Sequence, residues 1–175
     1  MDNHHITADS LIVAAHSHPK YVLRRAWGEF VARWTWEWFA TFTFVHGTHP
    51  ERALKLYGVW CSKLSRELYG PRWHKRPPYG VSYVVAVEFQ KSGQIHLHAL
   101  LCDVGDARRL TWMDNWLDLD DLAGFPRIFP VQNKDAVSNY VTKYVTKGGE
   151  VAFSTNLRIR SRQLFDSPPF PESET

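Results

Sequence analysis

Two histidines separated by one residue, His96 and His98, are the first side chains in the sequence whose types and spacing could do chemistry. They lie in an apolar run with the alternation of a β-strand, in which residues two apart point to the same face. Buried imidazole nitrogens need partners, so two of them on one face indicate a bound ion or a polar neighbour. The spacing by itself is equally compatible with surface histidines.

A neighbouring strand is predicted to supply a carboxylate. The segments VSYVVAVEF and QIHLHALL are separated by KSG, which predicts a β-hairpin. A symmetric turn pairs Gln90 with Gln94 and places Glu88 opposite His96. Glu88, His96 and His98 then form a two-His-one-Glu site; the alternative is a surface Glu–His pair. Such a donor set suits zinc, manganese or iron(II), and Mg²⁺ where a phosphate adds oxygens.

A tandem YVTK repeat carries the second chemical signal. Its tyrosines and lysines recur at helical spacing and share one predicted helix face: Tyr140, Lys143, Tyr144 and Lys147. The adjacent stripe is apolar: Val137, Val141 and Val145. An amphipathic helix with snorkelling lysines is the simpler interpretation. A cation beside a phenol also favours the phenolate, which makes this helix a candidate source of a nucleophile.

A metal site and a tyrosine together indicate phosphoryl transfer. The metal would polarise a phosphate, and the tyrosine oxygen would displace a 3′-hydroxyl and leave a 5′-phosphotyrosine bond. That bond conserves the energy needed to rejoin the ends. Two tyrosines about 6 Å apart along the helix axis would let the second attack while the first holds an end.

Three segments resemble the motifs of HUH endonucleases, in the same order: FATFTF, Glu88 with GQIHLHALL, and YVTKYVTK. The doubled tyrosine resembles that of rolling-circle initiators of small single-stranded DNA phages and related plasmids, and also that of two-tyrosine HUH transposases. The resemblance covers about residues 35–149. It implies a five-stranded antiparallel sheet, Mn²⁺ or Mg²⁺ as cofactor, and a nick in DNA.

Carried onto this chain, the resemblance implies a role for each matching residue. The implied metal ligands are His96, His98 and Glu88. The implied nucleophiles are Tyr144, which we expect to make the first cut, and Tyr140. Lys143 and Lys147 would assist at the phosphate.

The elements that must position these residues can be read from periodicity. Leu23, Trp27, Phe30 and Trp34 predict one helix, and Thr41 and Thr43 alternate with aromatics in a predicted strand. Thr48 and Glu51 predict a capping box for a second helix with Pro50 in its first turn and one apolar stripe. The remaining elements are the hairpin, a helix within residues 106–119, an edge strand within 124–132 and the tyrosine helix. The order predicts an α+β fold with helices packed on an antiparallel sheet.

Length and composition predict one domain and the surroundings in which it works. The 175 residues carry a net charge of +3, which does not indicate a histone-like coat. We expect a flexible segment over 1–20, the nuclease domain over 21–150, and a tail or linker over 151–175. The chain lacks a signal peptide pattern and an 18-residue apolar run, which predicts a cytoplasmic protein without a membrane partner.

The expected partner is single-stranded or hairpin DNA at a replication origin. A loop with interleaved basic and aromatic residues is a candidate DNA contact, or simply a solvated loop: Arg72, Trp73, Lys75 and Arg76. Arg108 and Arg109 are equally ambiguous. No P-loop occurs, so we expect a host or replicon helicase and a single-strand-binding protein as partners.

Two other functional classes remain open from the sequence. A metal enzyme could use the two-His-one-Glu site for hydrolysis or oxygenation, although the carboxylate that cupins place shortly after the histidines is missing here, where Leu101 and Cys102 stand. A non-catalytic origin-binding module is the other.

Overall fold

One antiparallel sheet of five strands organises the part of the chain that the computed structural model describes: Thr7, Asp9, Leu11, residues 20–133, Val137 and residues 150–166. The strand order is β4-β1-β3-β2-β5. The strands are β1 (Trp38–Phe44), β2 (Ser82–Phe89), β3 (Ile95–Cys102), β4 (Ala123–Pro130) and β5 (Val151–Phe153). The helices are α2 (Lys20–Ala32), α3 (Pro50–Tyr69), α4 (Arg109–Leu117) and α6 (Thr155–Asp166). The predicted α+β class and the antiparallel sheet of about five strands are confirmed.

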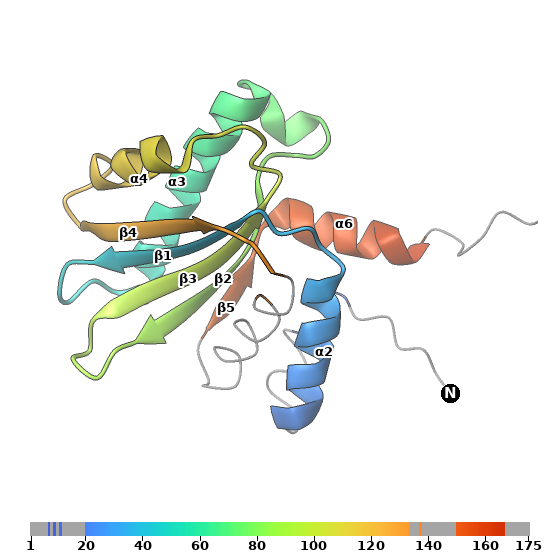
Figure 1. Ribbon diagram of the computed structural model, residues 1–175, viewed down its shortest axis with the longest axis horizontal. Coiled ribbons are helices and arrows are strands. Elements are labelled where there is room, and N and C mark those ends of the chain that lie inside the picture. The colour runs from blue at the N-terminus through green and yellow to red at the C-terminus, as the bar shows by residue number, and fades with distance from the viewer. Residues whose placement is uncertain are drawn as a thin grey trace, which may run out of the picture.

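Helices α3 and α4 cover one face of this sheet (Figure 1). The predicted stripe of α3 is buried there, and the ring of Trp60 lies 5.0 Å from that of Phe42 on β1. Trp116 of α4 packs against the same phenylalanine at 4.5 Å. The indole N–H of Trp60 donates to the carbonyl of Trp112, so this aromatic centre is closed without leaving that donor unpaired.

Helix α2 lies on the opposite side of the sheet from α3 and α4 (Figure 1). It forms where the sequence predicts it, and its Trp27 and Phe30 are buried. Trp27 stacks on Phe153 of β5 with ring centroids 5.2 Å apart. Leu100 of β3 and Leu157 of α6 join the same cluster. The cluster covers only part of the sheet face, since the end of β3 that carries the histidines does not belong to it.

The start of α3 differs from the prediction. The N-cap residue is His49, which makes no side-chain cap bond, and Pro50 opens the helix. The Thr48 hydroxyl donates to the carbonyl of Val45 instead, at 2.8 Å. The predicted capping box is therefore wrong, because Thr48 stands one residue too early and its hydroxyl closes the preceding turn. Glu51 remains in the first turn, where the helix dipole favours a carboxylate.

The segment after residue 150 is also different from the expected tail or linker. Val151–Phe153 pairs with β2 as an edge strand, with Ala152 opposite Val85. The next helix, α6, buries Leu157 completely, and the Asn156 amide donates to Gly80. The prediction failed because three residues are too few to show alternation, and this strand exists through its pairing with β2.

Two other predicted segments fall largely outside the described residues. The tyrosine helix, with Tyr140, Lys143, Tyr144 and Lys147, lies outside them, apart from buried Val137. Most of the N-terminal segment lies outside them as well. Its described Leu11 is buried in the α2-side cluster, which is not what a flexible segment predicts. None of the helices in the described part combines the length and apolarity needed to cross a membrane.

Candidate functional site

The β2–β3 hairpin has the register that the sequence predicts. Gln90 donates to the carbonyl of Gln94, and Glu88 lies directly opposite His96. The flanking residues Ile95 and Leu97 belong to the core beneath α3. Because side chains alternate along a strand, His96 and His98 point to the other face, together with Glu88. The hairpin therefore brings all three predicted metal ligands to the α2 side of the sheet.

His98 is the most buried polar residue of this group, with 9% of its side chain exposed, against 23% for Glu88. Its Nε2 lies 2.8 Å from Oε2 of Glu88. Its Nδ1 lies 3.1 Å from the Thr41 hydroxyl on β1. An ionised carboxylate only accepts hydrogen bonds, so Nε2 carries the proton in this arrangement, and the neutral ring accepts from Thr41. Both ring nitrogens are thus satisfied, and the ring is fixed in orientation.

His96 lies at the more open end of the site. Its Nδ1 is 3.2 Å from the Gln90 amide nitrogen, and its ring centre lies 6.1 Å from that of His98. Burial lowers the pKa of His96, and the Glu88 carboxylate partly offsets this effect. The imidazole is therefore neutral near pH 7 and keeps a lone pair available for a ligand.

The donor types of this group fit a divalent ion, but the described residues do not form a ready cage. No three His, Cys, Asp or Glu side chains among them are placed so that they could hold a metal. The structure instead contains the bonded pair of Glu88 and His98 with His96 beside it. Binding through this pair requires a metal to take the place of the proton between them. The metal site stays a prediction.

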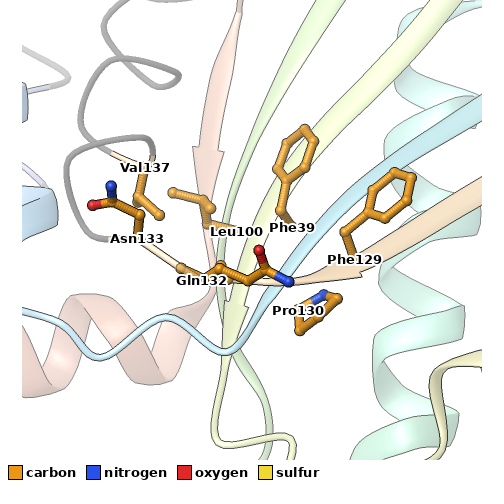
Figure 2. Close-up of a pocket in the computed structure, with 8 residues that line it drawn as sticks. Phe39, Leu100, Phe129, Pro130, Gln132, Asn133 and Val137 are labelled. Atoms are coloured by element: carbon orange, nitrogen blue, oxygen red, sulfur yellow. The ribbon is translucent and has the colours of Figure 1, made fainter.

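Both neighbours of the tyrosine segment are placed on the same pair of strands. Val137 packs beside Leu100, which lies two residues beyond His98 on the same face of β3 (Figure 2). At the other end, the carbonyl of Glu150 accepts from Val87, the residue before Glu88. Residues 138–149 connect these two points and lie outside the described residues.

The predicted DNA-binding loop is not brought to this group. Arg72, Trp73, Lys75 and Arg76 precede β2, whereas Glu88 stands near its other end. Six strand residues span about 20 Å, so the loop lies far from the histidines. Trp73 packs against Gly80, and the three cationic side chains are exposed. Arg109 is also engaged structurally, since its guanidinium donates to the carbonyl of Ile128.

Sequence reasoning missed Thr41 as a partner of His98. The alternation of Thr41 and Thr43 with aromatics was a signal that both hydroxyls share one face. The register of β1 against β3 could not be read from it, and that register places Thr41 opposite His98 and Thr43 opposite His96. Gln90 was used only to set the turn, although its side chain also contacts His96.

With this geometry established, comparison with known families is informative. The profile of a family of replication-associated proteins, described by the name ORF2, matches residues 37–149. The chain belongs to this family. The match spans the sheet from β1 to β4, the three hairpin residues and the whole tyrosine segment. Among curated proteins and among solved structures, nothing matches the chain.

Membership in the replication-associated family supports a role in replication, and with it DNA as the partner. The matched range ends at Gly149, immediately before β5. Strand β5 and helix α6 are therefore parts of this fold that lie beyond the matched region.

Proposed function

We propose that this replication-associated protein nicks and rejoins single-stranded DNA through a tyrosine nucleophile and so initiates rolling-circle replication. One observation carries the proposal: the chain leaves the sheet at Val137 and returns at Glu150 beside the strands that hold His98 and Glu88. The twelve residues between these points contain both tyrosines and both lysines of the repeat. A segment so short and tethered at both ends stays close to the histidine face.

The reaction exchanges one phosphodiester bond for another. The phenolic oxygen of Tyr144 attacks the phosphorus, the bond to the 3′ oxygen breaks, and a proton ends on the released 3′-hydroxyl. The product is a 5′-phosphotyrosine, and attack by a 3′-hydroxyl reverses the step. Tyr140 supplies a second nucleophile for strand transfer. Lys143 and Lys147 offset negative charge on the phosphate oxygens.

His96, His98 and Glu88 would hold a divalent ion, Mn²⁺ or Mg²⁺, which when bound supplies Lewis-acid polarisation of the phosphate. Thr41 acts as a positioning residue, since its hydroxyl contacts Nδ1 and fixes the ring of His98. The lowered pKa of His96 keeps its lone pair available at neutral pH.

The test is a covalent protein–DNA species on a denaturing gel. The full chain is incubated with Mn²⁺ and a randomised single-stranded oligonucleotide pool that is labelled at either end. We expect the 3′ label to migrate with the protein, because the 5′ phosphate at the cut is the one that becomes attached, and the 5′ label to be released on a shorter strand. EDTA and the double variant Tyr140→Phe/Tyr144→Phe should each abolish the adduct, whereas Tyr79→Phe should not.

The single variants separate the two tyrosines. Tyr144→Phe should lose the first cut, and Tyr140→Phe should keep partial nicking but lose strand transfer. DNA binding without any adduct would leave a non-catalytic origin-binding module as the function. Equal and complete loss in both single variants would contradict the use of two nucleophiles.

A further inference from the structure

The edge strand β4 presents an exposed group that the nicking reaction does not use. Phe125, Arg127 and Phe129 alternate with buried Pro126 and Ile128, so they point to the α2 side of the sheet. Phe125 is 60% exposed and Phe129 is 52% exposed, and Arg127 is exposed between them. We call these three residues the β4 rim.

Protection of the sheet edge explains only part of this arrangement. A charge such as Arg127 on an edge strand discourages pairing with another chain. Two large, solvent-exposed rings beside it have the opposite tendency, since adjoining apolar surface favours association. The phenylalanines therefore indicate a ligand with flat apolar faces, and the arginine indicates that this ligand carries negative charge.

The register connects the β4 rim to the histidine site. Arg127 lies opposite Thr41, which in turn lies opposite His98. Two strand spacings amount to about 10 Å, so Arg127 and His98 stand in one row across the sheet. In the next row, Phe129 lies opposite Phe39, and Phe39 lies opposite Leu100. The rim thus extends the site toward the free edge of the sheet.

A hollow of about 430 Å³ adjoins the rim. This volume lies within the roughly 300–1,000 Å³ typical of small-ligand pockets. Figure 2 shows the rings of Phe39 and Phe129 projecting to the same side from neighbouring strands, with Gln132 and Asn133 also lining the hollow. Two aromatic faces and two amide side chains offer stacking and hydrogen bonding to one nucleobase.

We propose that the β4 rim and this hollow bind unpaired bases of single-stranded DNA next to the cleavage site, with bases stacked on Phe125 and Phe129 and a phosphate paired with Arg127. The inference rests on the proposed function for its ligand, because a nick requires a single strand across the histidine face. Stacking tolerates any base, and a duplex cannot offer its base faces to the rings.

The test measures equilibrium binding without metal, so that it does not depend on cleavage. Fluorescence anisotropy in EDTA compares a dT20 strand with a strand of equal length built from abasic residues. We expect dT20 to bind more tightly, and Phe125→Ala or Phe129→Ala to weaken dT20 binding roughly 5- to 100-fold while changing abasic binding little. Phe129→Trp should restore the preference for bases.

Phe89→Ala is the matched control. Phe89 is as exposed as Phe125, at 60%, but its strand position alternates with Glu88 and so faces the other side of the sheet. It should bind dT20 like the wild type. Arg127→Ala should lower the slope of log affinity against log salt by about 0.7, as expected for one lost phosphate contact with a single strand. Arg52→Ala on α3, exposed on the opposite side, should leave the slope unchanged.

Several outcomes would overturn the rim proposal. They are wild-type affinity for dT20 in both Phe→Ala variants, an equal loss in Phe89→Ala, or a wild-type dimer in sedimentation that Phe129→Ala dissociates, since a second copy would then cover the rim. Failure of the two proposals can be told apart. Base-dependent binding without an adduct supports the rim and removes the nuclease, whereas an adduct with rim variants that bind normally removes only the rim.

Discussion

The two faces of the sheet are built from the same strands but have different compositions. Toward α3 and α4, the described side chains form one apolar cluster with interlocking rings, and the indole N–H of Trp116 is paired with the Gly124 carbonyl. Toward α2, a smaller apolar cluster covers one end of the strands, and Thr41, His96, His98 and Glu88 occupy the other. On β3, adjacent residues Leu97 and His98 belong to opposite faces.

This difference separates stability from chemistry within one strand. The sealed face supplies apolar burial, which is the main stabilising contribution to folding. The polar face holds His98 almost completely buried, which is tolerated because both of its ring nitrogens have partners. Substitutions on the two faces should therefore have separable effects, and the adjacent pair Leu97 and His98 provides a direct comparison.

The largest expected effect is that of His98→Ala on cleavage. Loss of one metal ligand should reduce Mn²⁺-dependent nicking at least about 1,000-fold, because metal stabilisation of phosphate charge is worth several kcal/mol. The fold should remain, as judged by circular dichroism and thermal unfolding. Cleavage at near wild-type rate in His98→Ala would exclude this residue from the site.

Leu97→Ala should have the opposite profile. Leu97 is completely buried beneath α3, so its truncation should lower the free energy of unfolding by about 2–5 kcal/mol in urea titration. At temperatures where the variant is folded, its nicking rate should stay within a few-fold of wild type. A stable but inactive Leu97→Ala protein would show that the two faces are not separable.

Thr41→Val should have a smaller effect that is confined to the site. It keeps the side-chain shape and removes the hydroxyl that contacts His98. Outer partners of metal-bound histidines are worth about 10- to 100-fold, so we expect about a 10-fold loss of nicking at limiting Mn²⁺, recovered in part at saturating Mn²⁺. Thr41→Ser should retain activity. If Thr41→Val lowers activity equally at all Mn²⁺ concentrations, Thr41 does not act through metal binding.

The smallest expected effect is a difference in thiol labelling, for which each face carries one buried free cysteine. Burial raises the pKa of Cys61, on the sealed face, to about 12, and burial also raises that of Cys102, on the α2 side. Since only the thiolate reacts, both native thiols should stay unlabelled by iodoacetamide from pH 7 to 9 except through local opening.

Cys102 should be labelled several-fold faster than Cys61, because the apolar cluster around it is smaller. Peptide mass spectrometry of timed samples measures both rates in one protein. Faster labelling of Cys61 would mean that the face beneath α3 and α4 is the one that opens more readily.

The sequence was sufficient for local structure and for the hairpin. The three-residue KSG turn fixed the register that places Glu88 opposite His96, and helical spacing identified α3 from its apolar stripe. Contacts between distant segments could not be read in this way. Thr41 and His98 are 57 residues apart in sequence and meet only through the pairing of β1 with β3.

Two other features depended on tertiary structure in the same manner. Strand β5 has three residues and no pattern of its own, so that only its pairing with β2 makes it a strand. The loop with Arg72 and Trp73 has a composition typical of DNA contact, but the length of β2 separates it from Glu88. Composition indicates what a segment could bind and leaves its distance from the site undetermined.

The central claim is that the segment between Val137 and Glu150 supplies the nucleophile to the histidine face. Tryptic mass spectrometry of the covalent adduct tests it most directly, because cleavage after Lys134, Lys143 and Lys147 leaves Tyr140 and Tyr144 on separate peptides. We predict a nucleotide on the peptide YVTK that begins at Tyr144, with adduct on DAVSNYVTK when Tyr144 is replaced by Phe. A nucleotide on a tyrosine outside residues 137–150 would contradict the claim.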